Sequence, residues 1–238
     1  MGKTHIQFNA LVMEMLGVFA LNYIGGMSCY DPSANNVAGP LAHGLALGIF
    51  IWIGAATSGA NYNPAVTVAL MLTKNIDLLN GLLYIVAQVV GSFLAWPFVW
   101  MGQNTENGKT NSVAGTFPNL SGTFEDDWWK FMLLEFFATF FLVFVVFATA
   151  VDKRASPAVF GAAIGLTVTM SAFGIGGITG AALNPCRWLG PATMTWMFNS
   201  KTLYSGTSYW QGLCVYLPAP VLGGAAAGPL YQGLLLER

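Results

Sequence analysis

Two short stretches of this 238-residue chain decide its fold: SGANYNPAV at residues 58–66 and TGAALNPCR at residues 179–187. Each combines small residues with an Asn-Pro pair, which begins at Asn63 in the first stretch and at Asn184 in the second. Proline suits the first turn of a helix, where its missing N–H leaves no helical bond unmade. Each stretch is therefore predicted to lead into a helix that begins at its Asn-Pro pair.

The two stretches belong to a longer internal repeat. Glu14 opens EMLGVFAL and Glu135 opens EFFATFFL, and 49 residues separate each glutamate from the Asn-Pro asparagine of its own half. The segments AHGL (42–45) and AIGL (163–166) match at the same offset. Equal spacing of three features indicates that the two halves share one structure.

The composition is that of a membrane protein. Hydrophobic residues make up 55% of the chain and charged residues only 8%, against roughly 25% charged residues in an ordinary soluble domain. The mean hydropathy is +0.59. A net charge of −1 offers no broad basic surface, so no nucleic-acid partner is expected. The expected surroundings are a lipid bilayer, in which helices satisfy their own backbone groups.

Charged residues divide the chain into apolar segments, and a spanning helix needs about 20 such residues. Six spans are predicted, at 6–27, 38–57, 79–100, 130–150, 157–176 and 209–234. Two further apolar segments, 58–73 and 179–198, are too short to cross and are predicted to be re-entrant half-helices. Three spans in each half make the second copy enter from the opposite side, which is an inverted repeat.

The predicted fold is an all-α membrane domain over residues 1–238. It consists of inverted repeats 1–103 and 128–238, joined by the connection 104–127. Lysine and arginine are modestly more frequent on the side of the termini, which predicts cytoplasmic termini and an extracellular connection. That connection carries a candidate N-glycosylation acceptor at Asn119, followed by Leu and Ser.

The paired half-helices suggest a chemistry. A helix N-terminus carries roughly half a positive charge, so two ends that meet at mid-membrane create a barrier to cations and protons. Asn63 and Asn184 stand at these ends, and their amides can donate hydrogen bonds to a passing water. The water oxygen then faces both asparagines and its hydrogens point outward, which interrupts a proton wire. The plainer interpretation, that both residues only cap their helices, is compatible with this one.

The chain resembles the aquaporin, or major intrinsic protein, family over nearly its whole length. The resemblance is carried by NPAV at 63–66, NPCR at 184–187, the two helix-opening glutamates and AQVVGSFLAW at 87–96. It implies six transmembrane helices with two re-entrant half-helices, a passive water channel, and a homotetramer with one pore in each subunit. The Asn-Pro boxes then comprise Asn63, Pro64, Ala65, Asn184, Pro185 and Cys186. Cys186 stands where the family usually has alanine and offers a thiol near the lumen.

The resemblance also implies a selectivity constriction. Its positions carry over by spacing to His43, Ala172 and Ala181, with Arg187 directly after the second box. Strict water channels usually have an aromatic residue and a histidine at the first two positions, and glycerol channels have aromatics at the first and third. This set matches neither and is nearest to plant vacuolar-type members. The expected permeants besides water are ammonia and urea, with glycerol and hydrogen peroxide as further candidates.

Other positions give a mixed indication of subclass. Trp188 and Ala192 stand where glycerol channels usually carry an aspartate and a basic residue, which favours the water-selective branch. In the last span, Tyr216 is typical of water channels and Leu217 of glycerol channels. Buried charges need partners. In the resembling family, Glu14 and Glu135 accept backbone hydrogen bonds from the non-helical loops, which is a supporting role.

Three alternatives remain. A secondary transporter also uses inverted repeats, but the acidic candidates for its ion site are the two symmetric glutamates. An intramembrane enzyme needs a nucleophile with a base, or metal ligands, which two histidines and three scattered cysteines do not supply. No metal, cofactor or catalytic residue is therefore expected. A non-conducting scaffold or adhesion protein of the same family is harder to separate by sequence. The host membrane, plasma or vacuolar or another organelle, stays open.

Overall fold

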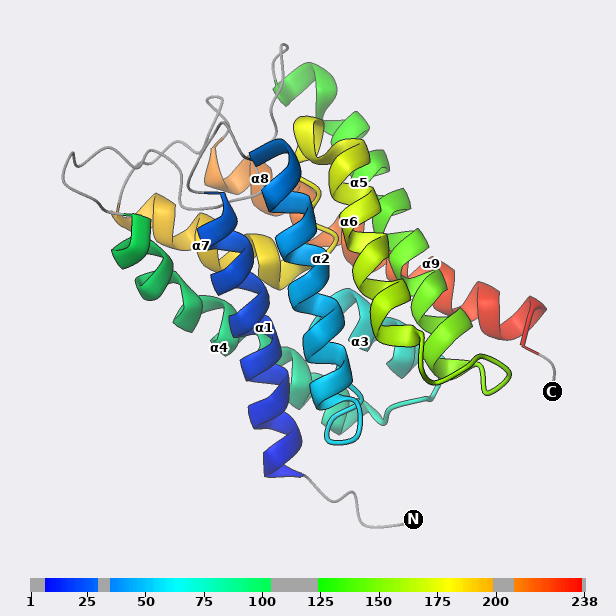
Figure 1. Cartoon of the computed structure of the whole chain (residues 1–238). Helices are drawn as coiled ribbons and strands as arrows, with labels where there is room; N and C mark the ends of the chain where they lie inside the picture. Colours follow the sequence, from blue (N-terminus) through cyan, green and yellow to red (C-terminus); the bar gives the residue numbers. More distant parts are fainter. Residues whose placement is uncertain (1–6, 30–34, 104–123, 199–207, 237–238) are drawn as a thin grey trace.

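The computed structural model describes residues 7–29, 35–103, 124–198 and 208–236. In this part of the chain, six helices are long and apolar enough to cross a membrane, as the hydropathy pattern predicts. They surround two shorter helices that start at the Asn-Pro pairs (Figure 1). The candidate glycosylation acceptor Asn119 lies outside the described residues.

The long helices have the following bounds: α1 Phe8–Ser28, α2 Asn35–Gly54, α4 Leu78–Gln103, α5 Phe124–Val146 and α6 Phe160–Thr179. The last crossing consists of α8 (Tyr209–Tyr216) and α9 (Pro218–Leu234). The half-helices are α3, Pro64–Leu72, and α7, Pro185–Phe198.

The bounds of the crossing helices, other than the start of α5, lie within four residues of the predicted ones. Helix α5 begins at Phe124, inside the predicted connection 104–127, and it ends in a π-helical turn, Phe147–Val151. The predicted span 209–234 is confirmed as one crossing, Tyr209–Leu234. Its helical bonding is interrupted at Pro218, which has no N–H to donate, although Leu217 keeps helical φ and ψ angles of −87° and −56°.

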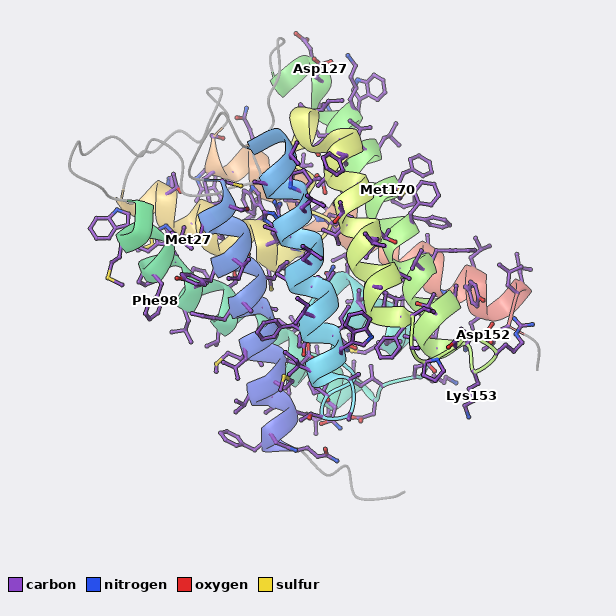
Figure 2. All side chains as sticks on the ribbon, viewed as in Figure 1. Met27, Phe98, Asp127, Asp152, Lys153 and Met170 are labelled. Atoms are coloured by element: carbon purple, nitrogen blue, oxygen red, sulfur yellow. The ribbon has the colours of Figure 1, made fainter. Side chains whose placement is uncertain are left out.

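The outer surface is apolar. Leu45, Val86 and Met170 are more than half exposed, at 57, 60 and 57%. Figure 2 shows such side chains around the helices, with Asp127 at one end of the molecule and Asp152 and Lys153 at the other. Side chains of this kind are solvated by lipid, so the chain is an integral membrane protein.

The helices pack in pairs that respect the internal repeat. Helix α1 packs on α4. Helix α5, which is the repeat counterpart of α1, packs on α9, and α2 packs on α6. The α2–α6 crossing is close because both helices present glycines. A Cβ placed on Gly44 would lie 2.5 Å from the Gly165 carbonyl oxygen. Half-helix α3 packs on α9, and α7 packs on α4 and α8. This frame holds the two half-helices in the interior.

Candidate functional site: a passage at the half-helix tips

The loops before the two half-helices have the same backbone path. Gly59 and Gly180, which are 121 residues apart, have φ angles of 86° and 81°. Four residues with a Cβ are also left-handed, at equivalent places in the two loops: Ala60 and Tyr62, with φ of 57° and 51°, and Ala181 and Leu183, with φ of 49° and 53°. Such conformations are uncommon away from glycine, so the loops need bonds from outside to hold them.

The Glu14 carboxylate on α1 supplies those bonds for the first loop. It accepts hydrogen bonds from the backbone N–H groups of Asn61 and Tyr62, at 2.9 and 2.7 Å. The Ser58 hydroxyl and the Gln88 amide donate to the same carboxylate, at 2.6 and 2.8 Å. An ionised carboxylate only accepts, so these four donors satisfy a charge that is fully buried.

Glu135 on α5 does the same for the second loop. It accepts from the Thr179 hydroxyl at 2.6 Å and from the N–H groups of Ala182 and Leu183, both at 2.9 Å. Each of these donors lies 121 residues after a donor to Glu14. Because a trans peptide points its C=O away from its N–H, two carbonyls in each loop face away from the glutamate.

Asn63 and Asn184 tie the two halves together. Each side-chain oxygen accepts the N–H two residues on, that of Ala65 or of Cys186, at 2.9 Å, and so caps its own half-helix. Each side-chain nitrogen donates across the molecule, Asn63 to the Leu183 carbonyl and Asn184 to the Tyr62 carbonyl, both at 2.8 Å. A primary amide has two N–H donors, and these bonds use one of the two on each asparagine.

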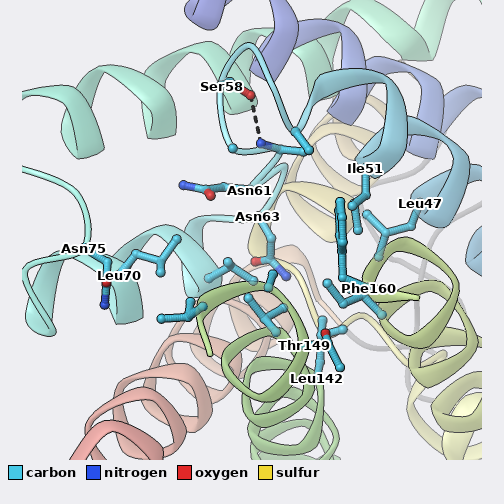
Figure 3. Close-up of a pocket in the computed structure, with 18 of the residues that line it drawn as sticks. Leu47, Ile51, Ser58, Asn61, Asn63, Leu70, Asn75, Leu142, Thr149 and Phe160 are labelled. Atoms are coloured by element: carbon cyan, nitrogen blue, oxygen red, sulfur yellow. Dashed lines mark hydrogen bonds between the residues drawn. The ribbon is translucent and has the colours of Figure 1, made fainter. Parts of the chain in front are cut away.

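Both asparagines line a cavity of about 770 Å³. The cavity runs from Arg187 at one end to Asp152 and Lys153 at the other, and Ala60, Asn61 and Ala182 of the two loops also line it. Figure 3 shows Asn63 pointing toward apolar side chains that include Leu142 and Phe160, while Asn61 points away from them. One wall therefore offers polar groups and the opposite wall is apolar, which suits a file of small polar molecules.

The predicted constriction residues occupy the Arg187 end. Residues 47, 51 and 55 of α2 and its following turn line the cavity, and His43 lies one helical turn beyond them. On α6 the lining residues are 160, 164 and 168, and Ala172 lies one turn beyond. His43 and Ala181 are 3 and 1% exposed, and Ala172 is half-buried. These three are not among the described residues that line the cavity, and their role in a constriction stays a prediction.

Arg187 is held by the second loop. Its Nη1 donates to the carbonyls of Gly180 and Ala181, at 3.2 and 3.1 Å, and the residue is 8% exposed. Its Nε is buried and has no hydrogen-bond partner among the described residues. The cavity lining therefore contains a fixed positive charge with an unused donor.

The other box residues are structural in position. Pro64, Ala65 and Pro185 are buried at the starts of α3 and α7. Cys186 is fully buried within the main hydrophobic core. It is not among the described residues that line the cavity, although its neighbours Asn184 and Arg187 are.

A hydrogen-bond node behind Cys186 was not predicted. The Ser92 hydroxyl on α4 donates to the Cys186 carbonyl and accepts from the Gly190 N–H at 3.0 Å. Asn22 on α1 donates to Ser92 and to the same carbonyl, at 3.1 and 3.2 Å. A hydroxyl thus bridges two groups that pair directly in a regular helix. The sequence signal was Pro191, which deprives the Arg187 carbonyl of its helical donor.

Trp188 begins an aromatic stack that the sequence also did not reveal. Its ring stacks between Tyr209 and Tyr216, with centroids 5.5 and 5.4 Å apart, and Tyr209 stacks in turn on Trp196 at 5.3 Å. The Tyr216 hydroxyl donates to the Thr179 carbonyl. Trp188 therefore packs α7 against α8. Its ring belongs to a buried hydrophobic cluster and is not among the described residues that line the cavity.

Polar links to α9 and its C-terminal end border the other mouth. Asp152 accepts from the Arg154 side chain at 2.6 Å and from the Tyr231 hydroxyl at 2.9 Å, and Arg154 also donates to the Leu235 carbonyl at 2.8 Å. On the other side, Asn75 donates to Gln232. The Arg154 guanidinium and backbone hold the pKa of Asp152 far below its ordinary value.

This lowered pKa makes a prediction about acid stability. An Asp152→Asn variant should unfold at a lower temperature than the parent at pH 7. The folded-state pKa of Asp152 lies below its ordinary value of about 3.9. Asp152 therefore stabilises the fold fully above a pH of about 3.9, and this stabilisation declines as the pH falls toward the folded-state pKa. The gap in unfolding temperature should thus narrow below about pH 4. Thermal unfolding in detergent measures it, with Lys153→Gln as the neighbouring control. A gap that is the same at every pH would contradict the assignment.

Comparison with known proteins agrees with this architecture. The sequence profile of the major intrinsic protein family matches residues 3–231. Nodulin-26 of Glycine max is 32% identical over 230 residues, which cover 93% of this chain and 76% of the relative. Aquaporin TIP1-2 of Musa acuminata is 33% identical over 207 residues, which cover 86% of this chain and 74% of the relative. The crystal structure of the aquaglyceroporin from Plasmodium falciparum superposes with a TM-score of 0.82 at 24% identity, and covers 95% of this chain and 96% of that one.

Six apolar crossings, two half-helices that meet at a lined cavity and the arginine at its end define a membrane channel of the aquaporin fold. The chain belongs to the major intrinsic protein family.

Proposed function

We propose that this chain is a passive channel for water that also passes small neutral solutes and excludes protons and ions. The observation that carries the proposal is the meeting of the two half-helix tips: Asn63 and Asn184 bond across to each other's loop and both line one continuous cavity. Relatives with the printed name aquaporin support the same conclusion.

The geometry supports a specific mechanism. A water at the tips accepts the remaining amide hydrogens of Asn63 and Asn184 with its oxygen. Its own hydrogens then point along the passage in opposite directions, toward the loop carbonyls on either side. Neighbouring waters are thereby oriented away from the centre, so no chain of hydrogen bonds runs through in one direction. The positive ends of α3 and α7 add an electrostatic barrier to cations at the same point.

The range of solutes follows from the Arg187 end. Ala172 and Ala181 contribute little bulk there, and Arg187 and His43 contribute polar groups. We propose that this constriction is wider than that of a strict water channel and passes ammonia and urea, with glycerol and hydrogen peroxide as further permeants to test. The lack of an aromatic wall in this set disfavours the alkyl part of a polyol.

The arrangement in the membrane is also a proposal. Residues 1–103 and 128–238 form inverted repeats, with both termini in the cytoplasm and the connection 104–127 outside, where Asn119 can be glycosylated. Family resemblance supports a homotetramer with one pore in each subunit. The relatives named for TIP and nodulin-26 types support a vacuolar or other organelle membrane, with the plasma membrane as the alternative.

The decisive test is flux through proteoliposomes. Stopped-flow shrinkage should be several times faster than in empty vesicles of the same lipid and should have a low activation energy, because water crosses without leaving a hydrogen-bonded path. The same vesicles should then be challenged with urea, ammonia and glycerol. Water flux equal to that of empty vesicles, for a folded protein, would refute conduction and favour the scaffold alternative.

A further inference from the structure

Gly25 of α1 lies directly against the His43 ring. A Cβ built on Gly25 would lie 2.2 Å from Nε2, 2.3 Å from Cδ2 and 2.7 Å from Cε1 of that imidazole. The ring is fixed from its other side, where Nδ1 lies 2.7 Å from the Gly39 carbonyl of its own helix. A carbonyl only accepts, so Nδ1 carries the hydrogen. The imidazole therefore occupies a recess on α1 that exists because residue 25 has no side chain.

The helical register places Gly25 in the constriction layer. Leu21 lines the cavity from α1, and Gly25 lies one turn further along the same face. On α2, Leu47 lines the cavity and His43 lies one turn beyond it. Gly25 and His43 thus both lie one turn beyond a cavity-lining residue, past the Arg187 end of the cavity. This shared position agrees with the contact between them.

The inverted repeat gives independent support. The residue that corresponds to Gly25 in the second half, 121 positions later, is Val146, which lines the cavity toward its other mouth. The counterpart of His43 is Ile164 and that of Arg187 is Val66, and both line the cavity as well. Positions of this type therefore face the passage. At this position the second half has Val146, whereas the first half has Gly25, whose side chain is a single hydrogen atom.

We propose that Gly25 is a fifth specificity-determining position of the constriction and acts by setting where the His43 ring stands. This inference rests on the proposed channel function. A methyl group at residue 25 requires the ring to move by roughly 1.5 Å to reach ordinary contact distance. Since α1 blocks one side, we expect the ring to move away from α1 toward the passage, where it reduces the aperture between α2, α6 and Arg187.

The test is a double-mutant cycle in proteoliposomes. Gly25→Ala should lower the permeability of the largest solute that the parent passes by about tenfold, and that of water by less, because pore diameter discriminates by size. In a His43→Ala background the same change should have less than a twofold effect, since no ring remains to be displaced. If water is the sole permeant, the loss and its rescue are measured in water flux.

Controls separate this role from simple packing. Gly176→Ala on α6, where a Cβ meets nothing within 4 Å, should leave all fluxes unchanged. Thermal unfolding in detergent shows whether Gly25→Ala folds. If it does not, recovery of folding in the double variant still supports the contact with His43. An equal loss in both His43 backgrounds would overturn the proposal, whereas failure of the parent to conduct water would instead refute the channel function.

Discussion

Replacing Glu135 with leucine should leave little folded protein. The change removes the acceptor of two buried backbone N–H groups, of Ala182 and Leu183, and of the Thr179 hydroxyl. Each orphaned donor costs about 1–3 kcal/mol, so the total is a large part of the 5–15 kcal/mol that typically stabilises a folded domain. The measurements are the yield of monodisperse protein and its unfolding temperature in detergent.

Two companion variants make this result specific. Glu135→Gln keeps one acceptor oxygen and should have an intermediate unfolding temperature. Glu14→Leu removes the acceptor of four donors instead of three and should be at least as damaging. A Glu135→Leu protein with the parental unfolding temperature would show that the left-handed loop is held by something else.

Replacing Arg187 with valine should make the channel leak cations while it still conducts water. Valine is the residue at the corresponding place in the first half, Val66, so the change gives both half-helices the same residue at this position. At an effective dielectric constant of about 20, two unit charges about 4 Å apart repel by roughly 4 kcal/mol. Loss of that repulsion should raise monovalent cation and proton permeability on the order of a thousandfold, since each 1.36 kcal/mol is a factor of ten in rate. Ion-sensitive dyes trapped in proteoliposomes measure both fluxes.

Arg187→Lys is the matched control for that experiment. Lysine keeps the positive charge, but it lacks the planar guanidinium that reaches the Gly180 and Ala181 carbonyls. Cation exclusion should therefore persist while the ratio of urea to water flux changes. Unchanged cation flux in Arg187→Val would assign the whole barrier to the half-helix tips.

The sequence could predict features that repeat or follow a period. The two Asn-Pro pairs and the apolar lengths gave the half-helix starts and the six crossings, and both are confirmed. The interruption of helical bonding at Pro218 could have been predicted from the missing N–H of proline, and it leaves the crossing Tyr209–Leu234 intact. The π-turn at the end of α5 has no comparable sequence signal.

The missed parts of the site depend on contacts between distant residues. Asn22 and Ser92 are 70 positions apart, and Asn22 and Cys186 are 164 apart, so no spacing rule connects them. Trp188 looked like a departure from a pore motif, although its surroundings are Tyr209 and Tyr216 of another helix. Gly25 has no side chain to attract attention, and its importance depends on where the His43 ring lies.

The exchange of bonds between the half-helix tips has a consequence for biosynthesis. The Asn63 amide donates to the Leu183 carbonyl, and the Tyr62 carbonyl accepts from the Asn184 amide. A ribosome must therefore make some 120 further residues before the first re-entrant segment gains these bonds. During that interval the first loop has its bonds to Glu14 but lacks those to the second half. The meeting of the two half-helix tips is thus a late step, which can be completed only when the second loop has been made.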